Sequence, residues 1–189
     1  YEYTISFPIL NQGLYDGITV TVTDTAGNES DSLTIPDFTI DTTAPTISEV
    51  TPITTPSNIR TPSYEFNTDK AGTITSTLAF SSGANATAGN NTITFSTLAE
   101  GTYSGETITV TDNSGNQGSV TIPDFTIDIT APVITLVGDA TVTVALGGVY
   151  NELGATADTG ETVVIDSSAV NVNVEGIYTV TYNATDAAG

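Results

Sequence analysis

Five aspartates recur at equivalent places in this sequence and are its clearest candidates for chemistry. Asp24 and Asp112 each begin an Asp-x-x-Gly-Asn stretch, and Asp186 begins a shorter version of it. Asp41 and Asp128 each stand four residues before a proline, in Asp-x-Thr-Ala-Pro. A carboxylate is the kind of hard oxygen ligand that Ca²⁺ takes, with six to eight oxygens at about 2.3–2.6 Å. Calcium ligation is therefore the first chemistry to consider.

The same residues also suit plain turns. The aspartate of Asp-x-x-Gly-Asn caps a hairpin turn through backbone hydrogen bonds, and the glycine takes a positive φ. The aspartate of Asp-x-Thr-Ala-Pro is an ordinary turn former as well. Neither pattern is a calcium loop of EF-hand type. A turn without a bound ion and a calcium site are both open readings.

Catalytic chemistry finds little support in the residue types. The chain has no His and no Cys, so it lacks the usual Ser-His and Cys-His nucleophile pairs. A self-made isopeptide crosslink would need Lys70 to be buried beside an Asn and an acid, whereas residues 67–72 indicate a loop. Paired carboxylates could hydrolyse glycosides, but the chain has no Trp or His to accompany them. The sequence indicates that the protein is not an enzyme.

The charge balance excludes several partners. There are 22 acidic residues against Arg60 and Lys70, which gives a formal net charge of −20 at pH 7. Nucleic-acid binding needs several Lys or Arg side chains against phosphates, and an anionic membrane surface needs the same. No stretch approaches the ~20 apolar residues of a membrane span, so we expect no membrane insertion. Such self-repulsion is tolerable when cations are bound or salt is present.

A long repeat divides the chain. Residues 10–45 recur as residues 98–132, with Pro36-Asp37-Phe38 matched by Pro123-Asp124-Phe125. A period of about 87 residues indicates tandem copies of one module. We predict three parts: 1–43, the C-terminal part of a module; 44–130, a complete module; and 131–189, a second subtype that is C-terminally incomplete. We therefore expect the chain to be part of a longer array of modules.

The modules are predicted to be all-β. Thr, Val and Ile alternate with a period of two, which is typical of half-buried strands, and no dozen residues keep a helical period. In the complete module we expect strands near 46–53, 62–68, 72–80, 90–97, 105–111 and 118–128. The apolar face of the last strand changes sides across Pro123-Asp124. A bulge, or a strand that passes from one sheet to another, would produce that change.

The sequence resembles bacterial immunoglobulin-like repeats of large surface proteins. The phrase carrying the resemblance runs from Ile108-Thr-Val-Thr-Asp112 to Phe125-Thr-Ile-Asp-Ile-Thr-Ala-Pro132. Residues 131–189 are similar to a bacterial surface Ig-like family. The motifs that carry this similarity are Gly154-Ala-Thr-Ala157 and Gly176-Ile-Tyr-Thr-Val-Thr-Tyr182. The resemblance implies tandem Ig-like β-sandwich modules in a row, at the extracellular cell surface. It also implies that Tyr15, Tyr103 and Tyr178 are tyrosine corners rather than a sugar-stacking platform.

In an Ig-like sandwich, the last hairpin lies at the same pole as the N-terminus of its own module. The resemblance therefore implies that Asp112 lies near Asp41 and that Asp186 lies near Asp128, while Asp24 would face a linker outside this sequence. Such pairs suit interdomain Ca²⁺, which would stiffen the joints between modules. Similar repeats of adhesins are known to use calcium in this way.

These observations predict a non-catalytic structural segment, either of an adhesin stalk or of an S-layer lattice. The expected partners are the neighbouring modules of the same chain, and identical copies in a lattice or filament. Two alternatives stay open: a module that binds a glycan or another ligand, and an accessory module of a secreted enzyme.

Overall fold

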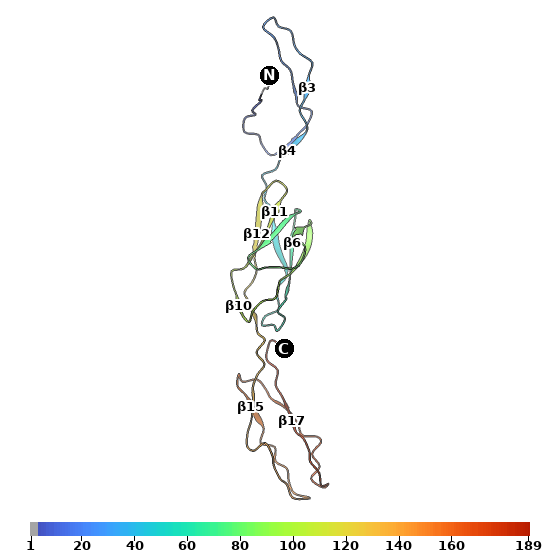
Figure 1. The fold of residues 1–189 in the computed structure, drawn as a ribbon, viewed down its shortest axis with the longest axis vertical. Coiled ribbons are helices and arrows are strands. Elements are labelled where there is room, and N and C mark those ends of the chain that lie inside the picture. The colour runs from blue at the N-terminus through green and yellow to red at the C-terminus, as the bar shows by residue number, and fades with distance from the viewer. Residues whose placement is uncertain (1–3) are drawn as a thin grey trace. The chain divides into compact units, whose positions relative to one another are not determined.

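The computed structural model describes residues 4–189, and every regular element among them is a β-strand (Figure 1). No described segment is a helix that could span a membrane. The all-β prediction is confirmed. Its cause is local, because β-branched Thr, Val and Ile pack well on a pleated sheet and lose side-chain freedom in a helix.

The chain divides into two compact units. Unit 1 takes in the residues up to Pro52 together with Tyr64–Ile93 and Glu106–Ile122, and unit 2 takes in Ile53–Ser63, Thr94–Gly105 and Pro123–Gly189. Both units therefore draw residues from the predicted module 44–130. The module boundaries proposed from the sequence stay a prediction.

Unit 1 contains a three-stranded sheet, a four-stranded sheet and two strand pairs. The three-stranded sheet has the order β5-β6-β9, the four-stranded sheet has the order β12-β11-β7-β8, and the pairs are β1-β4 and β2-β3. The strands are β1 (Gly13–Tyr15), β2 (Thr19–Val20), β3 (Leu33–Thr34), β4 (Phe38–Ile40), β5 (Ile47–Thr51), β6 (Ser63–Thr68), β7 (Gly72–Ser76), β8 (Asn85–Ala86), β9 (Gly89–Thr94), β11 (Thr107–Asp112) and β12 (Gln117–Thr121). The end residues Ser63 of β6 and Thr94 of β9 fall in unit 2.

The core of unit 1 comes from alternate residues of these two larger sheets. Tyr64 and Phe66 of β6 and Ile108 and Val110 of β11 are fully buried. Along β11 the buried residues alternate with half-buried ones, as expected for strands with one face on a core. The short β8 was not predicted, because Asn85-Ala86 carries no apolar alternation.

Unit 2 contains three antiparallel strand pairs, β10-β13, β14-β15 and β16-β17. Their bounds are β10 (Gly101–Tyr103), β13 (Phe125–Ile127), β14 (Ile134–Leu136), β15 (Ala155–Ala157), β16 (Val164–Asp166) and β17 (Thr181–Asn183). Phe125 and Ile127 are fully buried in this unit. Ser57 is bonded along β13, where its N–H donates to the Thr126 carbonyl (3.0 Å) and its carbonyl accepts from the Asp128 N–H (3.0 Å).

The predicted strand 118–128 is two strands with different partners. β12 pairs with β11, whereas β13 pairs with β10. The change of partner falls at residues 122–124, where Pro123 has no N–H to donate to a ladder. The same change occurs in the first copy, where β3 pairs with β2 and β4 pairs with β1. Of the two predicted causes of the change of face, the passage from one sheet to another is the one observed.

The two copies of the repeat differ in burial. Val22 and Val110 are at equivalent positions, yet Val22 is 69% exposed and Val110 is 0% exposed. In the second copy, β11 has β7 on its other edge. No strand occupies the corresponding edge of β2 among residues 4–189. The neighbouring segments of each copy, rather than the repeated sequence, make the difference.

Candidate functional site

The Asp41–Asp112 site lies in unit 1 and is built around one ammonium group. Lys70 Nζ donates to Asp41 Oδ2 (2.8 Å) and to Asp112 Oδ2 (3.1 Å). It also donates to the carbonyl oxygen of Thr43. The Asp112 side chain is 5% exposed and those of Lys70 and Asp41 are each 26% exposed. A half-buried cation thus joins three segments that are far apart in sequence.

Strand ends position these groups. Lys70 lies in the short connection between β6 and β7, where the Thr68 hydroxyl donates to its carbonyl oxygen (3.1 Å). Asp112 closes β11 and begins the predicted turn, and its Oδ1 accepts the N–H groups of Ser114 and Asn116 (both 2.9 Å). The Asn116 side-chain amide then donates to the Asp41 carbonyl (3.0 Å). The proximity of Asp112 to Asp41 is as expected from the sequence.

Hydrogen bonding shifts the ionisation of all three charged groups. Burial by itself would raise the pKa of Asp112, but the hydrogen bonds from Asn116 and Lys70 lower it to about 2. The hydrogen bond from Lys70 lowers the pKa of Asp41, and the bond to Asp41 raises the pKa of Lys70. Lys70 therefore stays an ammonium group at neutral pH, which is the form that cannot attack a carboxyl group.

We expect the contribution of Asp112 to the free energy of unfolding to depend on pH. Its folded pKa of about 2 lies below the unfolded value of 3.8. Its stabilisation is therefore fully present above about pH 4 and is lost as the pH falls through about 2. Urea midpoints of wild type and Asp112→Asn from pH 7 to pH 1.5 should differ by a constant amount down to about pH 4 and then converge. A difference that does not change with pH would show that the Asp112 charge contributes nothing.

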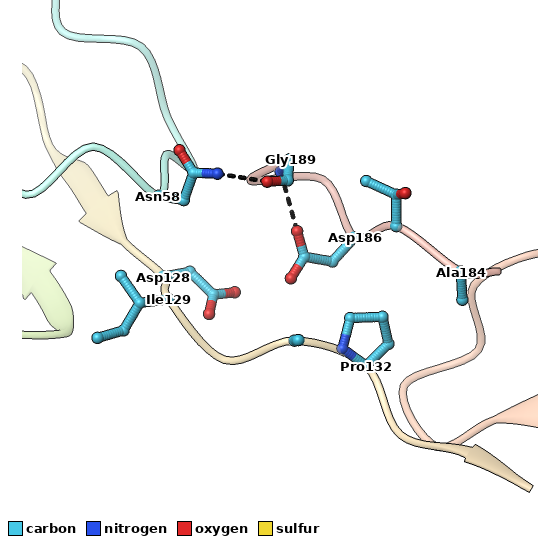
Figure 2. Close-up of a pocket in the computed structure, with 9 residues that line it drawn as sticks. Asn58, Asp128, Ile129, Pro132, Ala184, Asp186 and Gly189 are labelled. Carbon is cyan, nitrogen blue, oxygen red and sulfur yellow. Dashed lines mark hydrogen bonds between the residues drawn. The ribbon is translucent and has the colours of Figure 1, made fainter.

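The Asp128–Asp186 site lies in unit 2 and lines a pocket of about 510 Å³. Figure 2 shows Asp128 and Asp186 entering the pocket from different segments, with their carboxylates turned toward one another. Asp128 Oδ1 accepts the Thr130 N–H (3.0 Å). Asp186 Oδ1 accepts the N–H groups of Ala188 (2.9 Å) and Gly189 (3.0 Å). The structure therefore also brings this predicted pair together.

Asp24 has a different environment. Its Oδ1 accepts the N–H groups of Ala26 and Asn28 (both 2.9 Å), and its Oδ2 accepts from the Asn28 amide (2.9 Å). The side-chain hydrogen bond from Asn28 is the main cause that lowers the pKa of Asp24. Within the described residues Asp24 is exposed and acts as the cap of its own turn.

Metal ligation by these residues stays a prediction. Among residues 4–189, no group of three or more acidic side chains comes close enough to share one metal ion. Each site offers two carboxylates, so Ca²⁺ would need carbonyl oxygens and water to reach six to eight ligands. The Asp128–Asp186 pocket has room for an ion with several waters, since a water molecule occupies about 30 Å³. At the Asp41–Asp112 site the ammonium of Lys70 already lies between the carboxylates.

Sequence reasoning treated Lys70 as a loop residue and missed its role. One signal could have indicated it. Lys70 is one of two basic residues in a chain with 22 acidic ones, and it follows Asp69 at the end of a predicted strand. A basic side chain in such an acidic chain is expected to pair with carboxylates when it is partly buried.

The three tyrosines are bonded as tyrosine corners. Their hydroxyls donate to the carbonyl four residues upstream: Tyr15 to Asn11 (2.9 Å), Tyr103 to Ala99 (3.0 Å) and Tyr178 to Val174 (3.0 Å). Tyr15 and Tyr103 also stack on Phe38 and Phe125, at centroid distances of 5.2 and 5.1 Å. All three are half-buried rather than core residues. This bonding favours the structural interpretation over a sugar-stacking platform.

A separate polar cluster in unit 2 holds Glu152. Its carboxylate accepts the hydroxyls of Tyr150 and Tyr182 and the N–H of Gly154. The hydrogen bond to Glu152 raises the pKa of Tyr150 to about 12, and the bond from Tyr150 lowers the pKa of Glu152. The cluster ties β17 to the segment that precedes β15.

Comparison with known proteins finds a family match, and it lies within unit 2. Residues 134–189 match the family model described as bacterial surface protein, Ig-like domain. No curated protein matches the chain. The matched range covers β14 to β17 and includes the Glu152 cluster and Asp186. The chain is thus an all-β protein in which residues 134–189 are similar to the bacterial surface Ig-like domain family.

Proposed function

We propose that this chain is a non-catalytic structural segment of an extracellular repeat protein, a spacer in a cell-surface stalk or lattice. Its joints are stiffened by cations held between carboxylates. The family match supports a surface location, since the family is described as a bacterial surface protein. The neighbouring modules of the same chain, or identical copies in a lattice, are the partners that such a spacer would contact.

The observation that carries this proposal is the contact between Lys70 and both Asp41 and Asp112. Asp41 directly follows β4, so it belongs to the connection that leads into β5. Lys70 and Asn116 attach this connection to the loop after β6 and to the turn after β11. A connection bonded at two points has fewer conformations than a free linker of the same length.

Packing adds to this attachment. Pro45 is buried, and Gly118 of β12 lies directly against its carbonyl group. Proline also restricts the residue before it to extended conformations. The connection between β4 and β5 is therefore suited to transmit orientation rather than to act as a flexible tether.

For the Asp128–Asp186 site, we propose that a cation from solution, with Ca²⁺ as the best candidate, takes the place that Lys70 has at the other site. The two carboxylates and the pocket volume support this assignment. A chain with a net charge of −20 gains stability from any bound cation that offsets its self-repulsion.

Order parameters of the connecting segment test the spacer proposal. In wild type, the backbone amides of Thr42, Thr43 and Thr46 should have S² values near about 0.85, as in rigid backbone. In Lys70→Ala they should fall toward about 0.6, the value for flexible segments. Lys70→Arg, which keeps the charge, is the matched control and should stay close to wild type. Equal values in wild type and Lys70→Ala would refute the stiffening role.

A further inference from the structure

The two acidic sites occupy equivalent positions in the chain, because the strand pairs beside them have the same register. In β5 and β6, Ile47 pairs with Thr68, and in β14 and β15, Ile134 pairs with Ala157. One residue further along, the Thr46 N–H donates to Asp69 Oδ1 (2.7 Å) and the Val133 N–H donates to Asp158 Oδ1 (2.8 Å).

The reverse backbone bonds are also present, from the Asp69 N–H to Thr46 and from the Asp158 N–H to Val133. Asp69 is therefore equivalent to Asp158. Lys70 is then equivalent to Thr159.

This equivalence leaves the second site without a cation of its own. The Thr159 side chain is exposed and its hydroxyl donates to Asp158 and Glu161. The only basic residues of the sequence are Arg60 and Lys70. Arg60 Nε donates to the Leu98 carbonyl (2.8 Å). Residues 123–189 thus contain no basic side chain that could neutralise Asp128 and Asp186.

The carboxylate atoms that bind the ammonium in one site are unbonded in the other. Lys70 contacts the Oδ2 atoms of both Asp41 and Asp112. Within residues 4–189, the Oδ2 atoms of Asp128 and Asp186 accept no hydrogen bond, whereas both Oδ1 atoms do. In the first site, the Lys70 ammonium binds the two Oδ2 atoms. In the second site, the equivalent Oδ2 atoms are free to bind a cation in the pocket.

We propose that the residue at position 70 or 159 decides whether a site carries its own cation or recruits one. Lys70 makes the Asp41–Asp112 site independent of metal, and Thr159 leaves the Asp128–Asp186 site open to a divalent cation that prefers oxygen ligands. This inference rests on the proposed function, since it assigns one stiffening device to each site. It follows that the two sites respond differently to the same calcium concentration.

Amide shifts of the full chain during a Ca²⁺ titration at constant ionic strength test the inference. Thr130 and Ala188 report on the second site, because their N–H groups bond Asp128 and Asp186. Ser114 and Asn116 report on the first site through Asp112. In wild type, Thr130 and Ala188 should shift and saturate together, and Ser114 and Asn116 should not respond.

Two exchanges reverse this pattern. Lys70→Thr should make Ser114 and Asn116 respond to Ca²⁺ with saturation. Thr159→Lys should weaken the apparent Kd at Thr130 and Ala188 by about tenfold or more, or abolish the response. Lys70→Arg and Thr156→Lys are the controls, since the first keeps the charge at the site and the second adds a charge on the exposed face of β15. Both should behave as wild type.

Three results would overturn the inference. One is the absence of a saturating shift at Thr130 and Ala188 in wild type at ~10 mM Ca²⁺. Another is a shift of equal size at Ala26, whose N–H bonds the exposed Asp24, since that would show nonspecific binding to acidic turns. The third is an unchanged pattern in both exchanged variants. Failure of the spacer proposal is separate, because it appears in the order parameters of Thr42, Thr43 and Thr46 and not in the calcium response.

Discussion

Replacement of Phe125 by alanine should lower the free energy of unfolding by about 3–5 kcal/mol, the usual cost of truncating a buried Phe. The Phe125 side chain is 1% exposed and stacks on Tyr103 with an interplanar angle of 10°. Its removal leaves a cavity and removes the ring that supports the tyrosine corner. Urea unfolding followed by far-UV circular dichroism measures the change.

Phe38 is the matched control for this prediction. It is equivalent to Phe125 in the repeat and stacks on Tyr15 with an angle of 8°, but it is only half-buried. The stacking is therefore the same and the burial differs, so Phe38→Ala should cost about 1 kcal/mol. Equal losses for the two substitutions would contradict the difference in burial between the two copies.

Gly118→Ala is expected to cost about 3 kcal/mol, near the upper end for over-packing. A Cβ atom on Gly118 would overlap the carbonyl oxygen of Pro45. Backbone atoms on both sides cannot rotate away as a side chain can, so either β12 or the connection before β5 must move. Loss of the close approach should also lower the order parameter of Thr46.

Gly83→Ala provides the control. A Cβ atom at Gly83 meets nothing within 4 Å, and its φ is not in the left-handed region. This substitution should change stability by less than about 0.5 kcal/mol. If Gly118→Ala were as mild as Gly83→Ala, Pro45 would not be packed tightly against β12.

Local features of the sequence predicted local structure well. Alternating Thr, Val and Ile indicated the strands, because a period of two places one face on a core. The Asp-x-x-Gly-Asn pattern indicated turns whose hydrogen bonds close within four residues. The glycine-tyrosine pattern indicated hydroxyls that reach four residues upstream. In each case the interacting groups are neighbours in the chain.

Burial was not predictable from the repeated sequence, as Val22 and Val110 illustrate. Their local sequences are almost the same, yet Val110 lies within β11, whereas Val22 comes after β2 has ended at Val20. The exposed fraction depends on the segments that surround each copy. β11 pairs with both β12 and β7, whereas β2 pairs with β3 alone among residues 4–189. The 118–128 strand shows a related limit, since its apolar pattern indicated a change of face but left open whether a bulge or a change of sheet caused it.

The sequence by itself determined that this protein is built of β-strands, that its acidic turns recur, and that Asp41 and Asp128 each stand four residues before a proline. These properties follow from side-chain size, branching and turn chemistry over a few residues. Only the tertiary structure decided which cation lies between the carboxylates. Lys70 is 29 residues from Asp41 and 42 from Asp112, and an ion pair stabilises a site only when folding brings its charges within about 4 Å of each other.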